Sequence, residues 1–190
     1  MLSHLSEKGV AGFVMANGAM SSNSGGEDKI RKALIEKGFV ECIVALPSQL
    51  FFTVQIPACL WFIRKNRTRK ETLFIDARNV GYMADRTHRD FSDEDIKKMT
   101  DTYHQWRNNS PEYKDIKGFC KSADLKEIKA NDYTLTPGRY VGIADQEDDT
   151  EPFAEKMTRL TTELSEMFTQ SDRLQNEIKE KLASIGWEMK

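Results

Sequence analysis

Three runs of apolar residues stand out in the first third of the chain, at 10–16, 39–46 and 57–63. Nearly continuous apolar runs of this length are typical of strands buried on both faces, as in the middle of an α/β sheet. Residues 47–56, between the second and third runs, are too few for a crossover with a full helix, so we expect these two strands to be antiparallel neighbours. A shorter run, Thr72–Asp76, predicts a fourth strand.

Two helices are predicted between and after these strands. Residues 27–37 begin with acidic residues and stop before a glycine, and their apolar positions define one face. The residues expected to be buried on that face are Ile30, Ala33 and Leu34. The second helix starts after Ser92, a typical N-cap residue, and carries one apolar stripe. The members of that stripe are Ile96, Met99, Tyr103 and Trp106.

The most regular helical pattern lies near the end of the chain, over residues 152–185. Apolar residues recur there every three or four positions, interrupted by Ser171 and Lys181, and charged residues fill most other positions. An amphipathic helix of this length is about 50 Å long and cannot bury its stripe on a small domain alone. We expect it to pair with another helix in a coiled coil or to lie across a larger body. The stripe consists of Phe153, Met157, Leu160, Leu164, Met167, Leu174, Ile178 and Ile185.

These elements divide the chain into four parts. Residues 1–76 hold the predicted sheet, and residues 77–144 form a helical and irregular extension with a short helix after Asp124. Residues 145–151 are an acidic linker, and residues 152–190 hold the long helix. We expect one ordinary α/β domain followed by a helical tail.

Composition narrows the function classes. The chain has 190 residues and a formal net charge of -2, so no overall positive field attracts it to nucleic acid. No apolar run reaches the length of a transmembrane helix, about 18 residues, and the N-terminus lacks the basic-then-apolar order of a signal peptide. The cysteines and histidines show neither CxxC nor metal-ligand spacing. We therefore expect a cytoplasmic protein with reduced thiols, no metal and no membrane partner.

One short segment concentrates positive charge, because most of residues 64–70 are basic. Such a segment contacts phosphates in some nucleic-acid-binding proteins, and elsewhere it is a solvated turn between strands. Both interpretations are open here. The basic residues of the segment are Arg64, Lys65, Arg67, Arg69 and Lys70.

Catalytic motifs are not visible in the sequence. Neither a Gly-x-Gly-x-x-Gly pattern nor a P-loop occurs. No Ser/His/Asp or Cys/His grouping stands out, and the carboxylates fall in the first turns of helices and in linkers. Residue chemistry alone identifies no active site.

Five sequence blocks together resemble one family. The blocks are FVMANG (13–18), IRKALIEKG (30–38), VALPSQLFFTVQIPACLWFIRK (44–65), LFIDAR (73–78) and NDYTLTPGRYV (131–141). Their order and spacing are similar to the modification (M) subunits of type I DNA restriction-modification systems, which are adenine-specific DNA methyltransferases that use S-adenosylmethionine. The resemblance implies a Rossmann-like, seven-stranded sheet that ends in an antiparallel pair. The runs at 10–16, 39–46 and 57–63 would be its fifth, sixth and seventh strands.

The same resemblance implies that this chain is the C-terminal part of such a subunit. The family's Gly-rich cofactor turn and its Asn/Asp-Pro-Pro-aromatic catalytic motif have no counterpart here, where no two prolines are adjacent. S-adenosylmethionine is thus expected in the full-length protein and not in this fragment, which we expect to be inactive alone. The strand at 10–16 would lack its usual neighbour, so we expect a bare apolar edge, with self-association or partial disorder near residues 1–25.

Candidate site residues follow from the resemblance. The family flips the target adenine out of the duplex into a pocket. Phe51, at the LPxxLF position, would form a wall of that pocket, with Phe52 next, although either ring could instead be core or a hydrophobic cover. Asn17 could line the pocket or only form an Asn-Gly turn. Arg139 could reach a phosphate, pair with an acid or pack structurally.

The implied partners are the specificity (S) subunit, which reads the DNA sequence, the restriction (R) subunit, and double-stranded DNA through the complex. The stripe on residues 152–185 would contact the S subunit. Two alternatives remain open: a non-enzymatic assembly module that binds a specificity-type subunit, and a stand-alone nucleic-acid-binding protein that uses residues 64–70. The net charge disfavours the second alternative.

Overall fold

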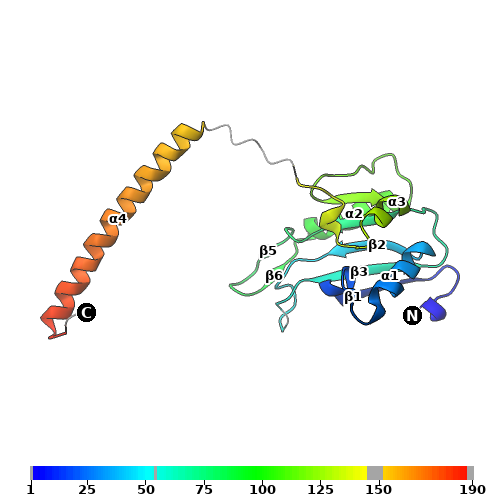
Figure 1. The fold of residues 1–190 in the computed structure, drawn as a ribbon, viewed down its shortest axis with the longest axis horizontal. Helices are drawn as coiled ribbons and strands as arrows, with labels where there is room; N and C mark the ends of the chain where they lie inside the picture. Colours follow the sequence, from blue (N-terminus) through cyan, green and yellow to red (C-terminus); the bar gives the residue numbers. More distant parts are fainter. Residues whose placement is uncertain (1, 54, 145–151, 188–190) are drawn as a thin grey trace. The chain divides into compact units, whose positions relative to one another are not determined.

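The computed structural model of the chain describes residues 2–53, 55–144 and 152–187 (Figure 1). The chain divides into two compact units, Met1–Asp145 and Gln146–Lys190. The sheet and the basic segment belong to the first unit, and the long helix belongs to the second. The predicted acidic linker, residues 145–151, lies outside the described residues.

The first unit is built on a mixed sheet of five strands in the order β1-β3-β2-β4-β7. Strands β2 and β3 pair antiparallel, as the short connection between them predicted, and β1 pairs antiparallel with β3 along its whole length. Strands β1, β2 and β4 therefore run in one direction, so their carboxyl ends meet at one edge of the sheet. The strands are β1 (Val10–Ala16), β2 (Val40–Ala45), β3 (Ala58–Arg64), β4 (Thr72–Asp76) and β7 (Cys120–Ala123).

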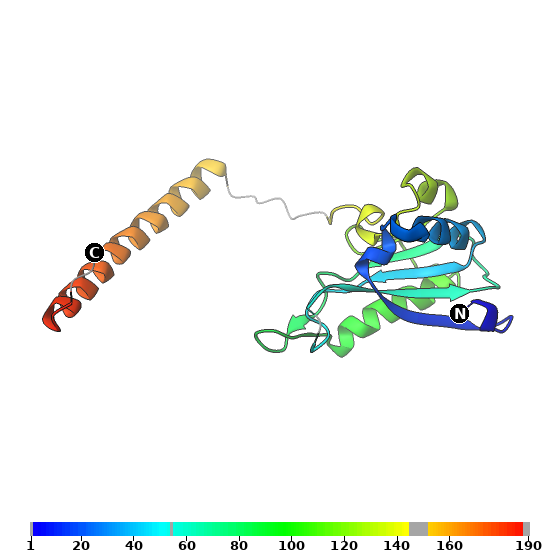
Figure 2. The same ribbon diagram turned by 60° about the horizontal axis from the view of Figure 1, so that its bottom comes forward.

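Helices cover both faces of this sheet. Figure 2 shows α2 on one face and α1 with α3 on the other. A small hairpin of β5 (Tyr82–Met83) and β6 (Arg89–Asp90) pairs apart from the main sheet. The helices of the first unit are α1 (Glu27–Glu36), α2 (Asp93–Arg107) and α3 (Leu125–Ala130), with 3-10 turns η1 (Leu2–His4), η2 (Asn17–Met20), η3 (Ser24–Gly26) and η4 (Pro137–Arg139).

The sheet separates two apolar layers. On the α1 and α3 face, Phe74 stacks on Tyr140 of the NDYTLTPGRYV block, with ring centroids 3.9 Å apart. On the α2 face, Trp106 is buried, and its indole Nε1 donates to Ser122 Oγ of β7 at 2.8 Å. The 131–141 block and α2 are thus tied to the same sheet as residues 1–76.

The start of α2 confirms the prediction from Ser92. Its hydroxyl accepts a hydrogen bond from the backbone N–H of Asp95, and the Asp95 carboxylate accepts from the backbone N–H of Ser92. This reciprocal pair is a capping box, which satisfies two backbone donors of the first turn. Along the predicted stripe, burial deepens from Ile96, which is 47% exposed, to the fully buried Trp106.

The predicted buried face of α1 is wrong for two of its three residues. Ile30 is 64% exposed and Ala33 is also exposed, while Leu34 is only partly buried. Arg31 and Ile35 are buried instead. The guanidinium of Arg31 donates to the carbonyl oxygens of Tyr133 (2.8 Å) and Ser22 (2.7 Å), which satisfies its buried charge and turns the helix toward the 131–141 block.

The second unit contains α4, which runs over Phe153–Ser184 where the periodicity predicts a helix at 152–185. Every residue of its apolar stripe is exposed, by between 42% and 78%. Within the described residues, no helix has the length and apolar character that crossing a membrane requires.

Candidate functional site

The carboxyl edge of the sheet gathers the residues predicted to surround the target base. Asn17 follows the last residue of β1, and the loop of residues 47–53 follows β2. In open α/β sheets, ligands bind outside the carboxyl ends of the strands. Phe51 and the end of β1 line the same hollow of about 290 Å³. The structure therefore brings the Phe51 loop and the end of β1 together at the edge where a ligand is expected.

The two phenylalanines of this loop have different surroundings. Phe51 is 40% exposed and also lines a second apolar hollow, of about 400 Å³, against α2. Phe52 is 87% exposed, and its ring stacks on His88 with centroids 4.1 Å apart and an interplanar angle of 12°. The Oδ1 atom of Asn17 is buried and, within the described residues, has no hydrogen-bond partner. The assignment of these three residues to a base pocket stays a prediction.

The β5–β6 hairpin contacts the 47–53 loop directly. The backbone N–H of Arg89 donates to the carbonyl oxygen of Gln49 at 2.9 Å. The turn of the hairpin is closed by Asp85, whose carboxylate accepts from the backbone N–H groups of Thr87 (2.7 Å) and His88 (2.8 Å). These hydrogen bonds, that from Thr87 first, lower the pKa of Asp85.

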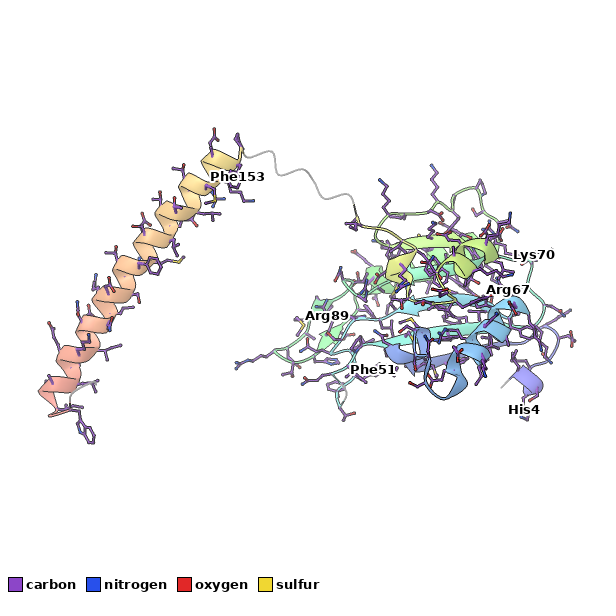
Figure 3. The ribbon with its side chains drawn as sticks, in the orientation of Figure 1. His4, Phe51, Arg67, Lys70, Arg89 and Phe153 are labelled. Carbon is purple, nitrogen blue, oxygen red and sulfur yellow. The ribbon has the colours of Figure 1, made fainter. Side chains whose placement is uncertain are left out.

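The basic segment 64–70 lies at the other end of the sheet. Figure 3 shows Arg67 and Lys70 at the end opposite to Phe51 and Arg89. This separation follows from the topology, because the segment joins the end of β3 to the start of β4. The structure therefore does not bring the predicted phosphate-contacting residues next to the predicted base pocket.

Most of these basic side chains have partners within the first unit. Arg64 Nε lies 3.4 Å from Glu41 Oε2, and Lys65 Nζ donates to the carbonyl oxygen of Leu5 at 2.6 Å. The Arg67 guanidinium donates to the carbonyl oxygens of Gly38, Val40 and Glu71, and burial lowers its pKa.

The two remaining cations of the segment differ from each other. Arg69 donates from Nε to Asn109 Oδ1 at 2.5 Å, and its guanidinium lies over the ring of Trp106. Lys70 is exposed. Lys65, Arg67, Arg69 and Lys70 all line one hollow of about 420 Å³, which also includes the acidic side chains of Glu36, Glu71 and Asp124. Contact of this segment with DNA stays a prediction.

Sequence analysis did not single out the ion pair at the end of β4. The Arg78 guanidinium donates to both carboxylate oxygens of Asp76, at 2.8 Å from Nε and 2.6 Å from Nη2. A Cβ atom on Gly138 would lie 2.5 Å from Arg78 Nη2. Gly138 therefore leaves room for this pair, which brings the LFIDAR and NDYTLTPGRYV blocks into contact. Arg139, the next residue, is exposed.

The cofactor that the resemblance implies is S-adenosylmethionine. That molecule carries a ribose diol and a charged amino-acid group, which need polar partners. Among the described residues, the hollow beside Phe51 is lined by apolar side chains, and the carboxylate of Asp76 is already paired with Arg78. The hollow beside Phe51 and the paired carboxylate of Asp76 therefore do not fit this cofactor. The described residues contain no group of His, Cys, Asp or Glu side chains that could hold a metal ion.

Comparison with known proteins identifies the family. The family model for N-6 DNA methylases matches residues 1–149, which is most of the chain. The chain belongs to the N-6 DNA methylase family. The chain is 55% identical over 189 residues to the methylase subunit of the type I restriction enzyme HindI from Haemophilus influenzae. It is 42% identical over 188 residues to the MjaIX methylase subunit from Methanocaldococcus jannaschii.

The alignments cover a much larger share of this chain than of either relative. The alignments cover 99% and 97% of this chain, but only 42% of the HindI subunit and 33% of the MjaIX subunit. The chain therefore spans less than half the length of these relatives.

Solved structures agree with the family. The methyltransferase subunit of a type I restriction-modification system from Streptococcus thermophilus superposes with a TM-score of 0.66 and 31% identity, over 75% of this chain and 28% of that one. The EcoKI M protein superposes with a TM-score of 0.55 over 88% of this chain and 41% of that one. Its identity of 18% supports the fold alone.

Proposed function

We propose that the chain is the C-terminal part of an M subunit of a type I restriction-modification enzyme, which methylates adenine in DNA with S-adenosylmethionine. The observation that carries this proposal is 55% identity to a methylase subunit over 99% of the chain, combined with coverage of only 42% of that subunit. The cofactor and the catalytic motif belong to the rest of the full-length protein. The chain alone is inactive.

In this proposal the first unit is the end of a Rossmann-like methyltransferase sheet. Strands β1, β2 and β3 take the places of its fifth, sixth and seventh strands, since β3 lies antiparallel between the other two. The loop of residues 47–53 and Asn17 lie at the carboxyl edge and contribute to the pocket for the flipped adenine. Support comes from the apolar hollow that Phe51 shares with the end of β1.

The second unit is the contact with the specificity subunit. The apolar stripe of α4 is widened on one side by Phe168, which is 62% exposed and directly follows Met167. A narrow stripe suits a two-stranded coiled coil, whereas a wider one suits packing in a bundle. We therefore propose that α4 packs against more than one helix of its partner complex, in an assembly that also recruits the restriction subunit and DNA.

A transfer assay tests the enzyme proposal. The full-length subunit that contains this chain is combined with its specificity subunit, labelled S-adenosylmethionine and duplex DNA. Methyl transfer to adenine N6 is expected, and the 190-residue chain with the same specificity subunit should give none. Failure of the full-length complex to methylate any adenine would contradict the proposal.

Copurification tests the contact of α4 with the specificity subunit, which the enzyme proposal and the assembly-module alternative share. Leu164→Glu places a charge on the α4 stripe, and Ser165→Glu places the same charge beside it on the polar face. Loss of the specificity subunit with the first variant and retention with the second is expected in both the enzyme and the assembly proposals. Only the enzyme proposal also requires methyl transfer by the full-length complex.

A further inference from the structure

Two arginines of the first unit have no partner in the part of the chain that the structure describes. Arg86 and Arg139 are exposed, and neither guanidinium forms a hydrogen bond or an ion pair with any of those residues. Every other arginine of this unit has such a partner, from the buried Arg31 to Arg107 beside Glu41. The described part of the fold therefore makes no use of the charges of Arg86 and Arg139.

Both of these arginines belong to the carboxyl edge of the sheet. Arg86 lies in the turn between β5 and β6, and this hairpin is bound to the 47–53 loop after β2. Figure 3 shows Arg89 of the same hairpin at the end of the sheet where Phe51 lies. Arg139 ends η4, which contacts β2 and β4, and the preceding Gly138 lies beside Arg78, just after the carboxyl end of β4. The two free guanidiniums are thus at the edge of the predicted base pocket.

The acidic neighbours of Arg86 do not pair with it. The Asp85 carboxylate accepts hydrogen bonds from two backbone N–H groups of the hairpin turn, at 2.7 and 2.8 Å. The Asp90 carboxylate accepts from the backbone N–H of Phe91 at 2.8 Å. Both acids therefore bind the backbone, and the Arg86 guanidinium keeps all its donors available for another anion.

The hairpin that carries Arg86 is fixed at its base and at its turn. The Arg89 side chain donates from Nη1 to the carbonyl oxygen of Gly81 at 3.2 Å, and its backbone N–H donates to the Gln49 carbonyl oxygen at 2.9 Å. Near the turn, the N–H of Ala84 donates to the carbonyl oxygen of His88 at 2.9 Å. The hairpin thus presents the Arg86 side chain from an ordered backbone.

We propose that Arg86 and Arg139 contact the phosphate backbone of the target duplex. The inference deepens the proposed adenine methyltransferase function and rests on it. A guanidinium can donate two parallel hydrogen bonds to one phosphate, and contacts to phosphates fix the register of a protein on a duplex. Two such contacts beside the base pocket hold the duplex while the adenine leaves the stack. The basic segment 64–70 lies at the opposite end of the sheet, and most of its cations already have partners.

The test measures how salt weakens DNA binding by the full-length subunit assembled with its specificity subunit. Binding of a fluorescein-labelled duplex is followed by anisotropy between about 0.05 and 0.2 M salt, and methylation is measured in parallel. Each phosphate contact contributes about 0.9 to the slope of log K against log salt concentration. Arg86→Gln and Arg139→Gln should each lower the magnitude of the slope by about 0.9, and the double variant by about 1.8.

Three controls separate a phosphate contact from other effects. Lys70→Gln removes the same charge from an exposed residue at the other end of the sheet and should leave the slope unchanged. Arg86→Lys keeps the charge and should restore the slope. A duplex without the recognition site should show the same reduction for Arg86→Gln, because a phosphate contact carries no sequence information. Equal thermal melting of the variants excludes a loss of fold.

The possible outcomes distinguish the inference from the function on which it rests. If the wild-type complex methylates adenine but Arg86→Gln has the wild-type slope, the phosphate contact is overturned while the proposed function stands. A slope that falls as much for Lys70→Gln, or a reduction confined to the duplex with the recognition site, also overturns the assignment. If the wild-type complex transfers no methyl group, the proposed function fails and this inference fails with it.

Discussion

Glu41 is a buried acid with three polar neighbours. Its carboxylate lies 3.4 Å from Arg64 Nε and 4.0 Å from Arg107 Nε, and it accepts a hydrogen bond from the Tyr103 hydroxyl at 2.9 Å. Burial, and then the charge of Glu41, raise the pKa of Tyr103 to about 12. The network joins β2, β3 and α2. Arg64 therefore has a structural role, whether or not it also contacts DNA.

The substitution Arg64→Ala tests the structural role of Arg64. The substitution leaves Glu41 buried with weaker partners, so we expect a loss of about 2 to 3 kcal/mol in the free energy of unfolding, less than for a fully unpaired buried charge. Lys70→Ala is the control, because Lys70 is exposed, and it should change stability by less than about 0.5 kcal/mol. Urea unfolding of the two variants measures these losses. Equal losses of unfolding free energy in the two variants would refute the structural role of Arg64.

At Gly138, a single added Cβ atom is expected to disturb the ion pair between Arg78 and Asp76. Alanine at this position would place Cβ 2.5 Å from Arg78 Nη2 and so push that guanidinium away from Asp76. Arg78 is half exposed and can move, so we expect a cost of only about 0.5 to 1 kcal/mol. In an Arg78→Ala background the same substitution should cost nothing. A double-mutant cycle measured by thermal unfolding checks this, and additive effects would show that the clash lies elsewhere.

At the scale of elements, the first turn of α2 depends on Ser92 and Asp95. Ser92→Ala removes the acceptor for the Asp95 N–H, and we expect it to destabilise the protein by about 1 kcal/mol at neutral pH. Ser92→Asp retains an acceptor and should recover most of that loss. Helix content and urea unfolding by circular dichroism measure both variants. If Ser92→Ala changes neither the helix content nor the free energy of unfolding, tertiary packing alone stabilises the first turn of α2.

The same cap predicts a pH dependence. Hydrogen bonds from the hydroxyl and then the backbone N–H of Ser92 lower the pKa of Asp95. A carboxylate with a lowered folded pKa stabilises the fold above its unfolded pKa, about 4, and this stabilisation is lost as pH falls through the folded value. The stability difference between wild type and Ser92→Ala should therefore shrink in acid. A difference that stays constant from neutral to acidic pH would argue against the contribution of Asp95.

Local chemistry explains which elements could be predicted from the sequence. The start of α2 was predictable because Ser92 and the acids after it act through neighbouring backbone groups. The antiparallel β2–β3 pair followed from connection length alone. β7 was not predictable, because its four residues include Lys121 and Ser122, and its place in the sheet depends on pairing with β4 and on the Trp106 hydrogen bond.

In the candidate site, too, some features follow from the local sequence and others depend on tertiary contacts. The sequence predicts Asn17 at the end of the first strand and Phe51 in the connection after the second strand, and the shared direction of β1 and β2 brings both to one edge. The face of α1 was mispredicted because an arginine with three hydrogen bonds can be buried while Ile30 stays exposed. The stack of Phe52 on His88 joins residues that no periodicity relates. The separation of segment 64–70 from Phe51 likewise required the topology.

At the scale of the whole molecule, β1 is an edge strand with apolar residues. Within the described residues it pairs only with β3, and Val14 and Met15 are 52% and 41% exposed. Ile30 and Phe13 line an apolar hollow of about 430 Å³ beside it. An uncovered edge of this kind promotes association of chains, so the isolated chain should self-associate as its concentration rises.

Val14→Lys tests whether β1 is the associating surface. A lysine on an edge strand disfavours pairing with another edge, so this variant should shift the sedimentation velocity profile toward monomer. Ile116→Lys introduces the same charge at another exposed apolar residue, outside β1, and should leave the association unchanged. A wild-type chain that remains monomeric at all concentrations would refute the prediction.

S-adenosylmethionine binding distinguishes this chain from the whole subunit. The hollow at the carboxyl edge is apolar, and the carboxylate of Asp76 at the end of β4 is paired with Arg78, so calorimetry on the isolated chain should give no heat at high micromolar cofactor. The full-length subunit should bind under the same conditions, because the proposed function assigns the cofactor-binding groups to its remaining part. Clear binding by the chain alone would show that its own residues form a cofactor site, and its assignment as an inactive C-terminal part would then be wrong. Absence of binding by both proteins would remove the support for a methyltransferase.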